Sequence, residues 1–341
     1  MYTVGHSRII SVGAYTPRNV LTSREVMEAI DSKNRFDIDP TWLERTTGIV
    51  SRHVSDPGVR PSDMAVSAAK QAMELSGCAA GEIDAIVYSG TLRDNVEPST
   101  AHKVQHKIGA TNAIAFDITN ACLGFMSAIH VVDSLIATGQ ARRGLIVTGE
   151  QGFHYARLNM DRLLKTHDRD LFNRLAAGLT LGDAGAAMIL GPKLAPDSGI
   201  MQIGAASAGE HAELCSIENE LSPIYTDMPP LFVETAKLLD QVYQRMTRER
   251  LKWHPEEIDI YIPHQVGIKG NKVHARTCGI DLAIIPDTVS SMGNIVSATI
   301  PYALARLHDL HRLKEGQKVF LSGTGSGISV AQAGVVWDAA A

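Results

Sequence analysis

Residues 82–88 of the chain read EIDAIVY, and residues 257–263 read EIDIYIP, 175 positions later. The run GLIVTG at 144–149 likewise has a counterpart, KVFLSG, at 318–323. The segments 82–149 and 257–323 therefore differ in length by one residue. A pattern that occurs twice in this way predicts two similar α/β halves packed about a pseudo-twofold axis, with equivalent strand ends close together.

Predicted strands and helices alternate along the chain. Apolar, β-branched runs predict a first strand within 6–16, buried strands at 83–89, 113–118 and 145–148, and a further strand over 179–190. Helices are expected from a capping box at Thr22, over 63–75, from 98 to 109 and over 123–138. This alternation favours the α/β fold class.

We expect the two halves to divide the chain in its middle. The N-terminal half covers 1–195 and contains a polar insertion over about 150–176, which we expect to cover a surface or make contacts. The C-terminal half covers 196–341 and is expected to repeat the order of elements.

Composition limits the classes of function. A chain of 341 residues suits two packed halves, and its net charge of −5 argues against a general nucleic-acid binder. The chain has no 18-residue apolar run without charges, so no membrane span is expected. Residues 1–6 do not resemble a signal peptide. The four scattered cysteines form no CxxC and no metal-ligand spacing, which favours reduced thiols in a cytoplasmic protein without a metal site.

Cys122 lies in NACLG at 120–124, where a predicted buried strand gives way to a helix. The first N–H groups of a helix and its partial positive charge stabilise a thiolate, so Cys122 is a candidate nucleophile. The alternative is a small buried hydrophobic residue, which is what most free cysteines are. The corresponding turn of the other half carries Asn294, and this favours a functional role.

His264 follows the second copy of the strand directly. It is therefore expected at the carboxyl edge of a sheet, where open α/β sheets bind ligands, and a Cys/His pair is the usual apparatus of covalent acyl transfer. A structural histidine is the alternative, since the chain has 13. The amide of Asn294 can donate to a developing enolate or thioester oxygen, or it can cap a helix.

Two further segments are candidates. GTGSG at 323–327 lacks the lysine of a phosphate-binding loop, so we interpret it as a tight turn whose backbone N–H groups face the cysteine. Glu97, in NVEPST at 95–100, would by itself be interpreted as a solvated glutamate before a proline.

Taken together, NACLGF (120–125), PHQ (263–265), GN (293–294) and GTGSG (323–327) resemble the thiolase-superfamily condensing enzymes of the β-ketoacyl synthase III type. The likeness covers nearly the whole chain, including WLERTTGI (42–49) and GDAGAA (182–187). Within the superfamily the chain is most similar to the OleA-type enzymes, which join two acyl-CoA chains head to head. The features that carry this likeness are EPST (97–100), HQV (264–266), Gly149-Glu150 and the segment from Ile295 to Trp337.

The resemblance implies a thiolase-like fold in an α-β-α-β-α arrangement and a homodimer that uses acyl-CoA thioesters and no cofactor. Cys122 would be acylated, and His264 and Asn294 would bind the thioester carbonyl and stabilise the enolate of the second substrate. The backbone amides of Cys122 and Ser326 would form the oxyanion hole. Glu97 would reach the partner subunit's site and abstract an α-proton, with its pKa raised by an apolar tunnel.

For the coenzyme, the resemblance points to Trp42 and Arg45. The chain departs from the pattern here, because the ordinary synthases carry an arginine four residues after the tryptophan, where this chain has Thr46.

The sequence leaves alternative functions open. A synthase III would condense acyl-CoA with a malonyl-acyl carrier protein, would not need Glu97, and would bind the acidic carrier through basic residues. Candidates for such a patch are Arg157, Arg162, Lys165, Arg169 and Arg174. Another alternative transfers the acyl group to oxygen or nitrogen in secondary metabolism, without carbanion chemistry. A silent partner subunit is disfavoured by the intact Cys/His/Asn set.

Overall fold

The structure is a computed structural model that describes residues 1–338, and it contains two five-stranded mixed sheets. The first sheet has the order β2 (Ser7–Tyr15), β8 (Asp183–Pro192), β7 (Gly144–Gln151), β5 (Ala85–Ser89) and β6 (Ile114–Ile118). The second has the order β1 (Tyr2–Val4), β9 (Gly199–Ser207), β14 (Ser329–Val336), β13 (Lys318–Gly325) and β12 (Ile260–Pro263).

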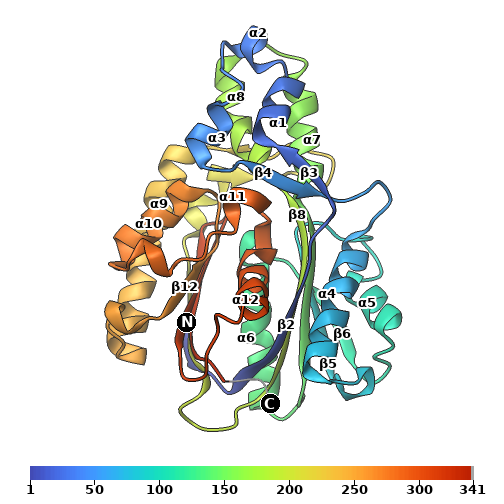
Figure 1. The fold of residues 1–341 in the computed structure, drawn as a ribbon, viewed down its shortest axis with the longest axis vertical. Helices are drawn as coiled ribbons and strands as arrows, with labels where there is room; N and C mark the ends of the chain where they lie inside the picture. The colour runs from blue at the N-terminus through green and yellow to red at the C-terminus, as the bar shows by residue number, and fades with distance from the viewer. Residues whose placement is uncertain (339–341) are drawn as a thin grey trace.

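Helices cover both faces of both sheets (Figure 1). Helices α6 (Gly124–Ala137) and α12 (Thr299–Asp309) lie between the sheets. Helices α4 (Pro61–Ser76) and α5 (Thr100–Ile108) cover the outside of the first sheet, and α9 (Met228–Gln244) and α10 (Ile268–Cys278) cover the outside of the second. These layers confirm the predicted α/β class and its α-β-α-β-α, thiolase-like arrangement.

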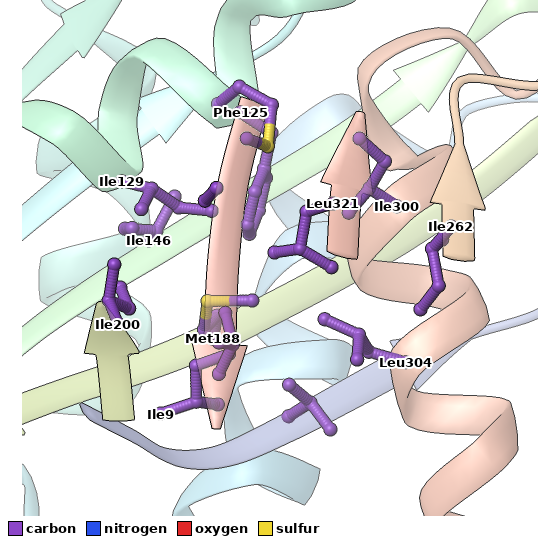
Figure 2. Close-up of a cluster of buried hydrophobic side chains, with 14 of the residues drawn as sticks. Ile9, Phe125, Ile129, Ile146, Met188, Ile200, Ile262, Ile300, Leu304 and Leu321 are labelled. Atoms are coloured by element: carbon purple, nitrogen blue, oxygen red, sulfur yellow. The ribbon is translucent and has the colours of Figure 1, made fainter. Parts of the chain in front are cut away.

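The central layer is the main hydrophobic core (Figure 2). Phe125 and Ile129 of α6 and Ile300 and Leu304 of α12 meet strand residues of both sheets, and all four are buried. Each helix carries an apolar stripe wide enough to contact two sheets, so the two halves share one interior.

The predicted repeats correspond to equivalent strands. The first copy forms β5, which pairs in parallel with β6 and β7, and the second copy forms β12, which pairs in parallel with β13. The predicted capping box is present, with Thr22 accepting from the backbone of Glu25 at the start of α1 (Ser23–Ala29). The division into domains at 195/196 stays a prediction.

Two expectations were wrong in detail. The second half does not repeat every element, because α11 (Val289–Met292) stands where a counterpart of β6 was expected. Asp287 explains the helix, since its carboxylate accepts from the backbone and hydroxyl of Ser290 and so begins a helical turn. Residues 176–180, expected partly as strand, form a 3₁₀ helix, η3 (Ala176–Thr180), and β8 begins only at Asp183.

The predicted insertion forms two helices, α7 (Gly152–Leu163) and α8 (Arg169–Leu175). Their apolar faces pack on α1, α2 (Ser32–Phe36) and α3 (Trp42–Thr47), as in the contact of Phe172 with Trp42, whose ring centroids are 5.4 Å apart. The group lies at one end of the molecule, at the top of Figure 1. Short strands β3 (Asn19–Thr22) and β4 (Ser51–Val54) connect it to the sheets, and β10 (Cys215–Ser216) pairs with β11 (Tyr225–Thr226).

No helix within residues 1–338 combines the length and the apolar character needed to cross a membrane.

Candidate active site

The turn that carries Cys122 is a short 3₁₀ helix, η2 (Ala121–Leu123), which leads directly into α6. Ala121 has φ 45°, a left-handed conformation that is uncommon for a residue with a side chain. In the other half, Val296 has φ 52°, just after Asn294. Strain of this kind persists only where the surrounding structure imposes it, and the two halves place it at the two candidate turns.

Cys122, His264, Asn294 and Ser326 line one cavity of about 670 Å³. The parallel pairing of β12 with β13 sets Pro263 opposite Ser322, so His264 emerges at the same sheet edge as the glycine-rich turn. Most of the remaining wall is apolar, with Leu43, Leu181, Ile217, Leu231, Phe232 and Leu239 among the lining residues. A cavity with apolar walls and a few converging polar groups is typical of a site for a small, largely apolar ligand.

His264 is buried, and neither of its ring nitrogens has a hydrogen-bond partner within residues 1–338. Burial lowers the pKa of His264 to about 4, because the charged imidazolium would lose its hydration. The ring is therefore neutral at physiological pH. One nitrogen can accept a proton while the other donates a hydrogen bond.

The Cys122 thiol is also held in its neutral form. Burial raises its pKa well above the usual range, and the nearby Cys215 and Glu150 act in the same direction. The sequence pointed to a thiolate stabilised by a helix N-terminus, whereas the structure gives a resting thiol in the same cavity as a neutral imidazole. Attack by Cys122 then requires a base that removes its proton during the reaction.

Asn294 is fixed by its neighbours. Its backbone N–H donates to Thr180 (3.0 Å) and its carbonyl accepts from Gly182 (3.1 Å). The side-chain Oδ1 accepts from the backbone N–H of Val296 at 3.0 Å. Oδ1 therefore supports the turn before η8 (Val296–Ala298), whose N-cap is Ile295. The Nδ2 group remains as a donor, and its role toward a substrate oxygen stays a prediction.

The glycine-rich turn packs directly on the cysteine turn. A Cβ built on Gly325 would lie 3.1 Å from both the backbone nitrogen and the Cβ of Leu123, and one on Gly323 would lie 2.6 Å from Leu123 Cδ1. A side chain at either glycine would force Leu123 or the turn itself to shift. The turn that carries Ser326 thus lies against the turn of Cys122, while the direction of its N–H groups toward the cysteine stays a prediction.

Known proteins are similar in sequence to this chain over almost its whole length. Two sequence models of one family match, 3-oxoacyl-[acyl-carrier-protein] synthase III over residues 116–209 and its C-terminal part over residues 249–337. The chain is 31% identical to an acyl-CoA:acyl-CoA alkyltransferase of Xanthomonas campestris pv. campestris, over 94% of the chain and 95% of that protein. It is 30% identical to a β-ketoacyl-[acyl-carrier-protein] synthase III of Wolbachia pipientis, over 95% of the chain and 96% of that protein.

Solved structures of related proteins superpose on this chain over nearly its full length. Cerulenin-bound OleA of Xanthomonas campestris superposes with a TM-score of 0.92 at 30% identity, covering 98% of each chain. A variant of OleA with bound lauric acid and lauroyl-CoA gives a TM-score of 0.92 at 29% identity, covering 98% of this chain and 100% of the other. The chain belongs to the 3-oxoacyl-[acyl-carrier-protein] synthase III family. It is therefore an acyltransferase of the condensing-enzyme type.

Of the remaining predicted site residues in this synthase III family member, only one lines the cavity. Trp42 lines the cavity, whereas Arg45 is exposed and does not line it, so its contact with a coenzyme stays a prediction. Glu97 is also exposed, in the loop between β5 and α5, and is absent from the cavity of its own chain. The role of Glu97 at the site of a partner subunit stays a prediction.

Much of the cavity wall was not predicted. Residues of β10, β11 and α9 line it, as does the buried His274 of α10, whose Nδ1 lies 3.0 Å from the hydroxyl of Tyr261. Burial and, to a lesser degree, His264 lower the pKa of His274 to about 3. The wall residues 215–239 lie outside the repeated pattern, so no sequence signal marked them. Across residues 1–338 no group of His, Cys, Asp or Glu side chains could hold a metal ion.

Proposed function

We propose that this protein condenses two acyl-CoA molecules head to head to a β-keto acid, through an acyl-Cys122 intermediate. The observation that carries the proposal is the cavity in which a half-buried thiol, a neutral imidazole and a fixed amide converge among apolar walls. The likeness to a protein named acyl-CoA:acyl-CoA alkyltransferase, over nearly the full length of both chains, supports the same substrate class.

In the first half-reaction, Cys122 attacks the carbonyl carbon of an acyl-CoA while neutral His264 takes the thiol proton. The backbone N–H groups of Cys122 and Ser326 donate to the carbonyl oxygen as it becomes an oxyanion. The bond to the CoA sulfur then breaks, and CoA leaves with the proton that His264 held. The acyl group remains on Cys122 as a thioester.

In the second half-reaction, another acyl-CoA lies with its carbonyl oxygen near His264 and Asn294. Both donate hydrogen bonds to this oxygen and stabilise the enolate that forms when a base removes an α-proton. The enolate carbon attacks the acyl-Cys122 carbonyl, and the sulfur of Cys122 leaves. The proton that the base removed passes to this sulfur, which regenerates both the base and the thiol. Hydrolysis of the resulting β-ketoacyl-CoA gives the β-keto acid and CoA.

We assign the base to Glu97 of a second subunit, since an unactivated acyl chain, unlike a malonyl group, has no carboxylate to lose. Three observations support a homodimer that brings Glu97 across. Within residues 1–338, β6 is the outermost strand of its sheet and has no strand on its other side. Ile114 on β6 is 55% exposed, and Val96 beside Glu97 is 78% exposed. Apolar residues on an open edge favour association with another chain.

Burial by the partner would also raise the pKa of this carboxyl, which is what a base acting at neutral pH requires. The steps use only side chains, backbone groups and the two substrates, so no cofactor is needed. The absence of disulfides among the four cysteines fits a reducing compartment such as the cytoplasm.

The main alternative is a synthase III that uses a malonyl-acyl carrier protein. Its basic patch on α7 and α8 is exposed, but three of its five members make contacts within the chain. Arg157 lies over the ring of Phe153 and Arg174 over that of Tyr225, while Arg169 donates to the carbonyl of Phe36. Acidic residues such as Asp161 and Asp168 interrupt the patch, so it is a weak docking surface for an acidic carrier.

Mass spectrometry of the purified protein with long-chain acyl-CoA alone tests the proposal. We expect an acyl adduct on Cys122 together with a β-keto acid or its decarboxylated ketone. An adduct that yields no product until a malonyl-acyl carrier protein is added would replace the proposal by the synthase III alternative. Failure of both, with transfer to an alcohol or amine, would indicate the O- or N-acyltransferase.

A further inference from the structure

Glu150 is a fully buried carboxylate for which the reaction above has no use. It lies near the end of β7, is 0% exposed, and forms no ion pair within residues 1–338. Burial raises its pKa, while hydrogen bonds from Ser297 and Thr91 act in the opposite direction. A carboxylate without a cation in such a place is costly unless hydrogen bonds satisfy it.

Two residues supply those hydrogen bonds. Ser297 donates to Oε1 through its hydroxyl (2.5 Å) and its backbone N–H (3.3 Å). Thr91 donates to Oε2 through its hydroxyl (2.7 Å) and its backbone N–H (3.2 Å). All four groups are donors, and both carboxylate oxygens accept. A glutamine has one accepting oxygen and one donating NH₂ group, so it could accept from Ser297 or from Thr91 but not from both.

The two donors belong to the two loops that act in the second half-reaction. Ser297 lies in η8 (Val296–Ala298), three residues after Asn294, and its hydroxyl also lies 3.1 Å from the carbonyl of Ser89. Thr91 lines the cavity and begins the loop that continues to Glu97. Glu150 therefore ties the turn of Asn294 to the loop of Glu97 across the boundary between the two halves.

The groups of the first half-reaction are held by other contacts. Cys122 lies in η2, whose Leu123 N–H donates to the carbonyl of Asn120 (2.9 Å), and the backbone N–H of His264 donates to Ser322 (2.9 Å). None of these hydrogen bonds involves Glu150. Its charge does act on Cys122, because it helps to raise the pKa of the thiol; removing that charge makes the thiol easier to deprotonate and should not slow acylation. A change at Glu150 should thus separate the two half-reactions.

We propose that Glu150 is a positioning residue for carbon–carbon bond formation: by holding Thr91 and Ser297 it sets the Asn294 turn and the Glu97 loop, and it has little influence on the acylation of Cys122. The inference rests on the proposed function for the order of the two half-reactions.

The experiment compares Glu150→Gln with the wild type in two assays on the full-length protein. One measures the rate of acyl-Cys122 formation from acyl-CoA by intact-protein mass spectrometry, and the other the steady-state rate of product formation. We expect acylation within about 3-fold of the wild type and a fall of about 100-fold in kcat for condensation, with a much smaller change in KM, as for lost transition-state interactions.

Ser297→Ala and Thr91→Val each remove one hydroxyl donor, and each should lower condensation more than acylation. Because the three residues act as a unit, the double variant Glu150→Gln/Ser297→Ala should be little worse than Glu150→Gln alone. The matched control is Asp133→Asn, a buried carboxylate that accepts from Ser7 (2.6 Å) far from these loops. Asp133→Asn should change the rates of acylation and of condensation by the same factor.

Equal losses in both assays for Glu150→Gln, or no loss in either, would overturn the inference. If Glu150→Gln does not fold, Ser297→Ala and Thr91→Val test the inference in its place. Condensation at the wild-type rate in both of these variants would also overturn it. Failure of the proposed function is a different result: the wild type would then form product only with a malonyl donor, and the comparison would be repeated with that donor.

Discussion

Replacing His264 by glutamine tests whether burial keeps this imidazole neutral. Burial lowers its pKa from 6.5 to about 4 in the folded protein, while the unfolded chain keeps a value of about 6.5. Between these values the unfolded chain binds a proton that the folded protein does not, so the free energy of unfolding rises with pH in this window. His264 therefore contributes a loss of stability as the pH falls from about 6.5 to about 4.

The size of the effect follows from the two pKa values. Linkage gives a loss of about 2 kcal/mol between about pH 8 and about pH 5 from His264 alone. His264→Gln removes the titrating group, so the variant should lose about 2 kcal/mol less than the wild type over this range. Other groups, including His274, contribute equally to both proteins and cancel in the comparison.

The assay is urea unfolding followed by circular dichroism at both pH values. His167→Gln is the control, because His167 is exposed and should leave the pH dependence as it is in the wild type. If His264→Gln loses as much stability on acidification as the wild type, His264 is not held neutral by burial.

Three further predictions concern the reaction itself. Cys122→Ala should abolish the acyl adduct in intact-protein mass spectrometry, and an adduct of unchanged mass in this variant would place the nucleophile elsewhere. Glu97→Ala should leave acylation intact and stop condensation, with Glu97→Asp retaining part of it; condensation at the wild-type rate in Glu97→Ala would exclude Glu97 as the base. Gly325→Ala places a Cβ 3.1 Å from Leu123 and should displace the turn of Ser326. The rate of acylation should therefore fall by about 100-fold. Gly209→Ala is the control, because the space around its Cβ position is open, and it should act as the wild type.

The sequence predicted the strands and the site positions best where a strong local pattern repeats. The apolar, β-branched runs of β5 and β12 were predicted as strands and are strands, and their repetition located His264 at a sheet edge. Local pattern failed at α11, where the carboxylate of Asp287 turns the expected strand into a helix. It also failed to show that α7 and α8 have an apolar face, because their many charged residues dominate the composition while Phe153, Leu163 and Phe172 are buried.

By itself, then, the sequence determined the α/β class, the duplication and the identity of the candidate groups at Cys122, His264, Asn294 and the glycine-rich turn, because short-range patterns encode each of these. The tertiary structure alone decided their state and surroundings. Burial makes both the thiol and the imidazole neutral, which depends on atoms from both halves. The cavity wall and the link from Glu150 to Thr91 and Ser297 join residues as far apart in the chain as 91 and 297. Contacts of that range arise only when the two sheets pack together, and no local pattern can specify them.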